Sequence, residues 1–422
     1  MSLNLNNYIK EISSIDQVIV QRDDNQSFEN MIDMVDKLCE GANEPSAILF
    51  SGNSDFSFLF NALGSVARVK CAMEIDSFKE ITSSITTAIQ SFTRCSDSII
   101  DRLNYIKSAN HFKNSSPRVK KRHSPCQDII KYKVDLENIS FLKYYKDNGL
   151  IFSALVNSYN SHKGSTHCEL LPLKVLSKDS FAIITNDETL CIDNLQNSSQ
   201  YRVPIAITFG GNPIYTILSM SHIPGNIGIY SLSGFLLNKR VDVTNALTQN
   251  IAIASDYDLV LEGYIQKNDE LYTDPESGKS YPKIHISCVT YRKEGVIMVN
   301  SDKSEKIQRK YINMVGERFL LFALNTLHNI NIIDLHLFED GENRYIIFKL
   351  PDSMCNNILR VAKRVIYSEY VPEYQSLIFV NEDITIRNKR DITELLENID
   401  KSKISVIENE NSKVITIYNA TK

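Results

Sequence analysis

The sequence predicts a mixed α/β fold in three parts: an N-terminal α/β domain, a central domain of short strands that forms a split β-barrel, and a C-terminal α/β domain. Three observations support this prediction. Helical periodicity and a buried strand occupy residues 1–115, closely spaced β-rich runs occupy residues 127–302, and helices alternate with strands over residues 303–422. Residues 116–126 are the expected linker between the first two domains.

The first domain begins with a helix followed by a strand. The run SFENMIDMVDKLCEG carries apolar residues at helical spacing and stops at Gly41, a residue type that commonly ends helices. SAILFSG then predicts a short buried strand, and a mostly helical stretch is expected over residues 77–109. The apolar positions of the first helix are Phe28, Met31, Ile32, Val35 and Leu38.

The predicted linker contains a basic run. NHFKNSSPRVKKRHSPCQD combines two prolines, a serine cluster and a basic run with four cations, and such a segment indicates a loop or a domain boundary. The cations could bind a phosphate or an acidic partner. A solvated linker is the alternative that we favour, because short charge runs are usually exposed to water. These cations are Arg118, Lys120, Lys121 and Arg122.

The central and C-terminal domains differ in their pattern. From Pro125 to about Asn300, short runs such as LIFSALVNSY, VPIAITF, DLVLEGYI and KIHISCVTYR are separated by Gly, Asn, Asp and Pro, as is typical of a barrel. Beyond Lys303, helical runs such as CNNILRVAKRVIYSEY alternate with strands such as RYIIFKL and SLIFVNED. This alternation predicts an α/β layer.

The composition excludes several classes of protein. Hydrophobic residues make up 43% of the 422 residues and the net charge is −5, which argues against a general nucleic-acid or membrane-surface binder. There is no apolar run of the roughly 20 residues that span a bilayer and no signal-peptide pattern, so we expect a cytoplasmic protein. The eight cysteines form no C-x-x-C pair and are expected to be buried thiols. No P-loop, G-x-S-x-G or H-E-x-x-H motif is present.

Six segments, in order, resemble the UbiD family of decarboxylases. EPSAILFSGNSDFSFLFNALGSVARVKCAMEID contains an N-x-x-G-S-x-x-R segment, and SPCQDIIKYKVDLENISFLKYYKDNGLIFSALVNSY resembles the entry into the family's central barrel. VPIAITFGGNPIYTILSMSHIPG resembles its P-x-A-x-x-x-G-x-x-P strand and turn. DYDLVLEGYI, YPKIHISCVTYR and SLIFVNEDITIRNKRDITELLENID resemble three later elements, so the resemblance covers most of the chain.

The resemblance implies a fold, a cofactor and a reaction. Members of the family hold a prenylated FMN, commonly with a divalent metal ion, in a flavin-binding-like split barrel. They add or remove CO2 on aromatic or α,β-unsaturated acids, and the modified flavin accepts electron density as the carboxylate leaves. Many are dimers or higher oligomers, so self-association or a hetero-oligomer with a related protein is expected by resemblance.

At the positions where the family keeps its site residues, this chain departs from the pattern. His167 stands at the position of a metal-binding Asn, and Pro172 at that of an Arg that orients the catalytic acid. Ile184 and Ile229 stand where a metal-binding His and a metal-binding Glu are expected. Isoleucine offers no ligand atom to a hard cation. We therefore expect a diverged member without the usual divalent metal, and we assign no metal ligand.

The segment SYNSHKGSTHCELLP carries the candidate cofactor-binding residues His167, Cys168 and Glu169. His167 and Glu169 could contact an anion in the flavin cleft, with Cys168 as a nucleophile. A plain β-hairpin explains the polar run equally well, and strand alternation would then point Cys168 to the face opposite His167 and Glu169. His222, in LSMSHIPG, is a further candidate for lining the cofactor pocket.

Glu276 in DPESG is the candidate catalytic acid, since it could stand for the first acid of the family's P-E-G loop. The alternative is an exposed acid in a turn. His285, between Ile284 and Ile286, is expected to have a cross-strand role, and Gly210 and Gly211 are expected to form a tight turn because G-x-G-x-x-G is absent.

Two functions remain open from the sequence. The first is a diverged UbiD-type decarboxylase that acts on a small aromatic or α,β-unsaturated carboxylic acid. The second is a non-catalytic UbiD-like homologue that serves as a binding or scaffold partner. The order of the segments favours an inherited pocket, and the changes at the four positions favour loss of the original reaction.

Overall fold

The structure is a computed structural model. It describes residues 4–15, 18–22, 27–52, 56–93, 109–120, 123–160, 165–185, 189–221, 228–340, 343–368, 376–384, 386, 389–408 and 414–421. Two compact units are present. The first comprises Met1–Ser77, Ser84–Met220 and Ile227–Tyr311, and the second comprises Phe78–Ser83, Ser221–Asn226 and Ile312–Lys422. The domain limits expected from the sequence stay a prediction.

The first unit contains a four-stranded sheet with the order β1-β2-β3-β17. Its helix α2 matches the apolar spacing expected from the sequence, and Ser27 caps it by accepting a hydrogen bond from the backbone N–H of Asn30. The last strand, β17, pairs in parallel with β3 although more than 200 residues separate them in the chain. The elements are α1 (Leu5–Ile15), β1 (Val18–Arg22), α2 (Phe28–Cys39), β2 (Ala47–Ser51), β3 (Phe56–Phe60), α3 (Val66–Met73) and β17 (Gly295–Val299).

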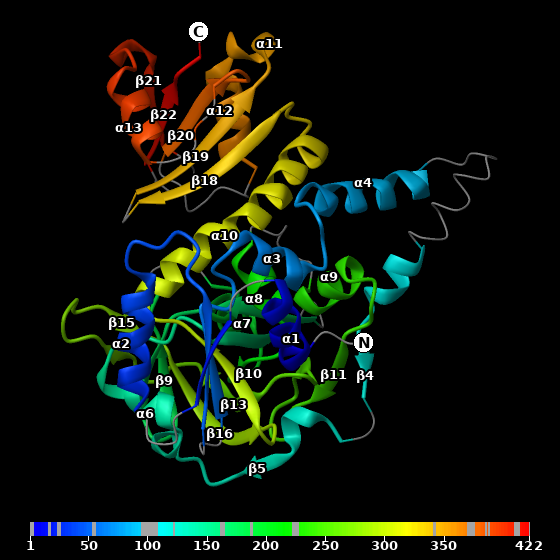
Figure 1. The fold of residues 1–422 in the computed structure, drawn as a ribbon, viewed down its shortest axis with the longest axis vertical. Helices are drawn as coiled ribbons and strands as arrows, with labels where there is room; N and C mark the ends of the chain where they lie inside the picture. Colours follow the sequence, from blue (N-terminus) through cyan, green and yellow to red (C-terminus); the bar gives the residue numbers. More distant parts are fainter. Residues whose placement is uncertain are drawn as a thin grey trace. The chain divides into compact units, whose positions relative to one another are not determined.

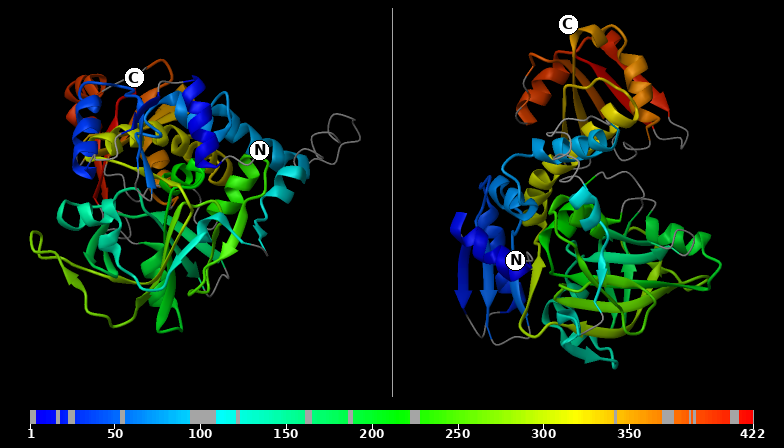
Figure 2. Two further views of the ribbon diagram at one scale, coloured as in Figure 1. Left: turned by 60° about the horizontal axis from the view of Figure 1, so that its bottom comes forward. Right: turned by 90° about the vertical axis from the view of Figure 1, so that its right-hand side faces the viewer.

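The same unit contains a curled sheet, a half-barrel with the order β7-β6-β10-β13-β16-β9-β8, to which β5 adds by pairing with β16. Figure 2 shows this sheet, in green, as a layer distinct from the N-terminal sheet in blue. Neighbouring strands are antiparallel. The strands are β5 (Ile129–Lys131), β6 (Leu155–Asn160), β7 (Ser165–Leu170), β8 (Leu173–Ser177), β9 (Ser180–Ile183), β10 (Arg202–Phe209), β13 (Leu259–Gln266) and β16 (Lys283–Tyr291).

Side chains of the curled sheet and of α2 share one apolar core. Phe28 on α2 packs on Phe58 and Phe141 at centroid distances of 5.1 and 6.2 Å, and Phe141 reaches Phe209 on β10 at 5.3 Å. Burial of such aromatic rings supplies much of the free energy that holds the two sheets together. The helices that complete this part of the chain are α4 (Lys79–Thr93), α6 (Ser140–Asp147), α7 (Leu190–Asn197), α8 (Pro213–Met220) and α9 (Ile229–Leu236).

Two smaller sheets lie outside these layers. One has the order β12-β11-β4 and the other is the hairpin β14-β15. Strand β4 comes from the basic run of the predicted linker, where Arg118 binds Asp242 through Nε at 2.7 Å, and Lys120 lies 3.9 Å from the same carboxylate. Lys121 and Arg122 lie outside the described residues. The strands are β4 (Arg118–Val119), β11 (Asp242–Asn245), β12 (Ala252–Ala254), β14 (Tyr272–Thr273) and β15 (Ser280–Tyr281).

The N-x-x-G-S-x-x-R segment holds the start of α3 in place. Asn61 has a positive φ of 53° and donates to the carbonyl of Pro45 at 2.5 Å. A Cβ on Gly64 would lie 1.9 Å from the Asn61 side chain, so only glycine fits there. Ser65 caps α3, and the fully buried Arg68 also donates to Pro45, at 2.6 Å. In this structure the segment has a structural role.

The second unit is built on a five-stranded sheet with the order β18-β19-β20-β22-β21. One face packs against the end of α10 and against α12, and the other packs against α13. Helix α10 begins in the first unit, ends in the second and continues as a π-helical turn, Ala323–Leu327. Figure 1 shows these elements in yellow to red. They are α10 (Asp302–Phe322), β18 (Asp334–Asp340), β19 (Asn343–Leu350), α11 (Asp352–Cys355), α12 (Ile358–Ile366), β20 (Ser376–Asn381), α13 (Lys389–Glu397), β21 (Ile404–Glu408) and β22 (Val414–Asn419).

The structure also shows the hydropathy of the described helices and the state of the described cysteines. Among the helices that the structure describes, none is long and apolar enough to cross a membrane. The seven cysteines within the described ranges are free thiols, and burial raises the pKa of each of them. Cys95 lies outside the described residues.

Candidate functional site

A strand, a two-glycine turn and a helix form the centre of the candidate site. β10 ends at Phe209, Gly210 and Gly211 follow with φ of 74° and 76°, and α8 begins at Pro213. The backbone N–H of Gly211 donates to the Asp258 carboxylate at 2.9 Å. A Cβ on Gly210 would lie 2.6 Å from the carbonyl oxygen of Val296. The glycines therefore serve a tight turn and a close backbone approach, as the sequence predicted.

A buried network of tyrosines lies beside this turn. Tyr230 on α9 donates to Asn157 Oδ1 at 2.7 Å, and its hydroxyl lies 3.2 Å from that of Tyr257. Asn157 in turn donates to Thr208 Oγ1 at 3.0 Å, and the ring of Tyr215 lies 5.4 Å from that of Tyr230. Burial raises the pKa of all three tyrosines well above the usual value. The network is therefore neutral, and its hydroxyls can only donate and accept hydrogen bonds.

Cys168 belongs to this network. It is buried on β7 opposite Asn157, and its thiol is in hydrogen-bonding contact with Tyr257. Burial, the largest cause, raises the pKa of the thiol, and the nearby Glu169 adds to the shift. A protonated, enclosed thiol is a poor nucleophile. The structure therefore places Cys168 where a packing role suits it better than the nucleophilic role considered from the sequence.

His167 and Glu169 point to the other face of β7, toward α7. The Glu169 carboxylate accepts a hydrogen bond from the backbone N–H of Cys191, at 3.0 Å, in the first turn of α7. His167 pairs across the sheet with Ser158, which accepts a hydrogen bond from Asn194 of α7 at 2.9 Å. The three neighbouring candidates thus lie on two faces. Only His167 and Glu169 share one, and Glu169 already caps a helix there.

The positions at which the family resemblance expects an arginine and two metal ligands carry apolar residues. The N–H of Ile184 donates to the carbonyl of Pro172 at 2.9 Å, so these two positions adjoin each other. Ile229 is the first residue of α9, and a Cβ added to the preceding Gly228 would lie 3.9 Å from the Thr166 carbonyl oxygen of β7. Within the described ranges, no group of three or more His, Cys, Asp or Glu side chains could hold a metal ion. Ile184 and Ile229 carry no atom that could bind a divalent metal. His222 lies outside the described residues.

Glu276 lies apart from these residues, in the turn that joins β14 to β15. It is exposed, and the turn is held by Asp274, whose carboxylate accepts hydrogen bonds from the Ser277 N–H at 2.9 Å and from its hydroxyl at 2.6 Å. Gly278 completes the turn with a φ of 68°. His285, the expected cross-strand residue, stacks on Tyr264 at 5.4 Å and binds Asp269 at 2.5 Å.

Two acids that the sequence analysis did not single out, the buried Asp258 and the partly exposed Asp256, lie next to the glycine turn. Asp258 is 1% exposed, and its carboxylate lies 3.3 Å from Arg292 Nε. Tyr215 donates to Asp256 at 3.2 Å. Burial, the largest cause, raises the pKa of both acids to about 6, although Arg292 acts in the opposite direction. Their signal in the sequence is the D-Y-D triplet directly before the LVLEG strand.

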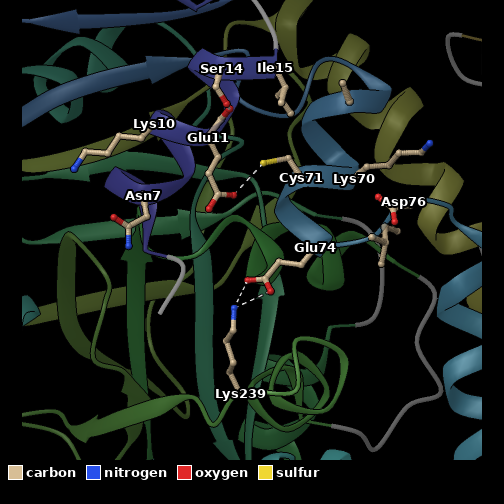
Figure 3. A pocket seen from close by; sticks show the side chains of 12 residues that line it. Asn7, Lys10, Glu11, Ser14, Ile15, Lys70, Cys71, Glu74, Asp76 and Lys239 are labelled. Carbon is tan, nitrogen blue, oxygen red and sulfur yellow. Dashed lines mark hydrogen bonds and ion pairs between the residues drawn. The ribbon is translucent and has the colours of Figure 1, made fainter. Parts of the chain in front are cut away.

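A separate pocket of about 870 Å³ lies between α1 and α3 (Figure 3). Two pairs of its polar side chains are in contact. Lys239 binds Glu74 at 2.6 Å, and the Cys71 thiol lies 3.6 Å from Glu11. Burial, followed by the charge of Glu11, raises the pKa of this thiol to about 12. A protonated thiol beside a carboxylate is a poor nucleophile, so Cys71 is not a candidate for nucleophilic catalysis.

Comparisons with known proteins relate this geometry to a family. Residues 117–301 match the family model UbiD, described as the 3-octaprenyl-4-hydroxybenzoate carboxy-lyase Rift-related domain. An uncharacterized protein of Aquifex aeolicus is 20% identical over 355 residues, which are 80% of this chain and 72% of that protein. An uncharacterized protein of Helicobacter pylori strain J99 is 25% identical over 63% of this chain and 45% of its own length.

Solved structures resemble the whole chain. Vanillic acid decarboxylase of Sedimentibacter hydroxybenzoicus, in its closed form, has a TM-score of 0.77 at 16% identity and covers 100% of this chain and 93% of its own. An evolved dimeric form of the UbiD-class enzyme HmfF from Pelotomaculum thermopropionicum, in complex with prFMN, has a TM-score of 0.74 at 13% identity. The match covers 100% of this chain and 95% of that chain. Apo 3,4-dihydroxybenzoic acid decarboxylase of Klebsiella pneumoniae has a TM-score of 0.72 at 14% identity, and the match covers 99% of this chain and 94% of that chain. The predicted family resemblance and the mixed α/β fold are confirmed.

Proposed function

Because the chain carries a UbiD-family domain at residues 117–301 within a UbiD-class fold, we propose that it is a carboxy-lyase. Its substrate in this proposal is a small aromatic or α,β-unsaturated carboxylic acid. The observation that carries the proposal is the fold match along the whole chain to structures named as decarboxylases of vanillic and 3,4-dihydroxybenzoic acid. A prenylated flavin, when bound, would supply the electron sink that side chains lack.

The residues of this chain have narrower roles in the proposal. His167 is the candidate cofactor contact on the α7 face, and His222 is a second candidate in the segment between α8 and α9. Cys168 and Glu169 act on the same strand through packing and helix capping. No step is assigned to a divalent metal, because Ile184 and Ile229, at the two expected ligand positions, offer it no ligand atom.

Glu276 is the candidate proton donor. A carboxylic acid that donates a proton near neutral pH needs a raised pKa, which burial supplies. Asp256 and Asp258 have this burial, whereas Glu276 is exposed in a turn. For Glu276 to act, the β14–β15 hairpin would have to enclose it when substrate binds.

A second candidate function is a non-catalytic UbiD-like protein that binds a ligand or a partner chain. The specific observation in its favour is the apolar character of Pro172, Ile184 and Ile229, at the positions where the resemblance expects an arginine and two metal ligands. We expect a homo-oligomer, or a hetero-oligomer with a related protein, under either function.

The first experiment is a UV–visible spectrum and a native mass of the full chain, purified from cells that also make prenylated FMN. The carboxy-lyase proposal expects flavin absorbance, a mass above the 48.0 kDa of one chain, and CO2 release from at least one aromatic or unsaturated acid. A colourless protein that neither takes up added flavin nor releases CO2 would favour the non-catalytic function.

Glu276 is tested next, once an active substrate is found. Glu276→Gln is expected to abolish turnover with substrate binding retained, since the amide cannot donate the proton. Glu270→Gln is the matched control, because Glu270 is another exposed acid of the same region, paired only with Lys283 at 3.4 Å. Unchanged turnover in Glu276→Gln would remove this residue from the mechanism.

A further inference from the structure

Strand β18 lies at one end of the five-stranded sheet, and side chains of α10 cover its free edge. Among the strands that the structure describes, β18 pairs with β19 alone. On the other side, the backbone N–H of Leu337 donates to Glu317 Oε1 at 3.0 Å, and Arg318 donates to the carbonyl of Leu335 at 3.3 Å. Free strand edges invite pairing with other chains, and a cover of charged side chains prevents it.

The cover is part of a cluster of four charged or titratable groups. Arg318 binds Asp334 at 2.7 Å and lies 3.5 Å from Glu317 Oε2. The imidazole of His336 bridges the two acids, with Nδ1 at 3.6 Å from Glu317 and Nε2 at 3.9 Å from Asp334. The side chains of Glu317 and Arg318 are only 8% and 12% exposed, and that of His336 is 38% exposed.

Among these four groups alone, the charges balance only when His336 is protonated. Two carboxylates face one guanidinium, so a neutral imidazole leaves a net charge of −1 and an imidazolium brings it to zero. The hydrogen bond to Glu317 raises the pKa of His336 above its usual value, and the charges of Glu317 and Asp334 add to this, against burial and Arg318. On β19, Lys349 lies opposite Asp334.

We propose that His336 is a pH-sensitive clamp: its protonation tightens the hold of Glu317 and Arg318 on the free edge of β18, and its deprotonation loosens that hold. The sign follows from linkage. A histidine whose pKa is raised in the fold stabilises the fold fully below its unfolded value of about 6.5, and this contribution is lost as the pH rises through the folded value. The edge of β18 should therefore be best protected in mildly acidic solution.

Hydrogen exchange of the full chain tests the clamp at the Leu337 amide. We expect protection in the peptide that contains Leu337, corrected for intrinsic exchange, to fall roughly two- to fivefold between pH 5.5 and 8, the range for a partly exposed ion pair. His336→Gln should remove this dependence and keep the far-ultraviolet circular dichroism of the wild type. His328→Gln, in the same unit, is the matched control and should behave as the wild type.

A direct titration of His336 in the wild-type chain tests the clamp even if the His336→Gln variant does not fold. In the wild-type chain with 13C-labelled histidine, the resonance of His336, assigned by its loss in His336→Gln or from backbone connectivities, should titrate above pH 6.5. A midpoint at or below 6.5 would overturn the clamp. So would a Leu337 protection factor that shows the same pH dependence in wild type and His336→Gln.

Discussion

Two acidic side chains of the first unit, Glu276 and Asp258, lie in contrasting surroundings. Glu276 lies in the exposed β14–β15 hairpin, where the only structure around it is a turn held by Asp274. Asp258 lies under the glycine turn after β10, bonded to Gly211 and next to Arg292. Its pKa is raised to about 6 because it is buried.

The difference teaches that the surroundings of a carboxyl group, more than its sequence motif, determine its proton affinity. The hairpin acid was nominated by its resemblance to a catalytic loop. The buried acids have the perturbed proton affinity that is common at functional sites, yet their contacts fix a backbone turn. Three experiments on stability separate these roles.

Asp258→Ala should give the largest effect. It leaves the nearly buried Arg292 without its closest acid and the Gly211 N–H without an acceptor. Removal of one member of a buried ion pair costs about 3–5 kcal/mol. Urea unfolding at pH 7 measures this loss. Glu276→Ala is the control and should change the free energy of unfolding by less than about 0.5 kcal/mol. Equal losses of unfolding free energy in the two variants would contradict the proposed difference between the buried acid and the exposed acid.

Gly210→Ala should have the next largest effect. The new Cβ would lie 2.4 Å from Asp258 Oδ2 and 2.6 Å from the Val296 carbonyl, at a φ of 74°. Left-handed strain and the backbone clash together cost about 2–4 kcal/mol. The hairpin offers a matched control, since Gly278 has a φ of 68° but no atom within 4 Å of an added Cβ.

Gly278→Ala should therefore show the strain alone, about 1–2 kcal/mol. The shift in the urea midpoint of each variant gives the two values. A cost for Gly278→Ala as large as that for Gly210→Ala would mean that backbone conformation, and not the approach of Asp258 and Val296, requires glycine at position 210.

The third experiment concerns the pH dependence of stability. Because the pKa of Asp258 is raised from 3.8 to about 6 in the fold, the folded chain binds more protons than the unfolded chain between pH 4 and 6. The free energy of unfolding should therefore fall as the pH rises through this window. Since one pKa unit corresponds to about 1.4 kcal/mol, Asp258 contributes at most about 3 kcal/mol.

This contribution is the difference between the wild type and Asp258→Asn in urea unfolding at pH 4, 5, 6 and 7. The asparagine cannot ionise, so the variant should lack this part of the fall. Glu276→Gln should reproduce the wild-type profile. A profile of Asp258→Asn that is parallel to that of the wild type would show that Asp258 keeps an ordinary pKa in the fold.

Local patterns in the sequence determined much of the fold. The apolar spacing from Phe28 predicted α2, and the Gly-Gly-Asn-Pro turn predicted the end of β10. These features depend on neighbours within a few residues, where backbone sterics and side-chain periodicity decide the conformation. The order of six segments was enough to indicate the UbiD fold, which the comparisons confirm.

Tertiary structure alone decided the environment of each candidate residue. Strand alternation separates Cys168 from His167 and Glu169, but only the packing of α7 and α9 shows that one face holds a helix cap and the other a tyrosine network. The partnership of β17 with β3, and the meeting of Glu317 with His336, join segments that local patterns do not relate. Burial and charge are sums over such long-range neighbours, so the sequence could name acids and histidines while the fold determined their proton affinity.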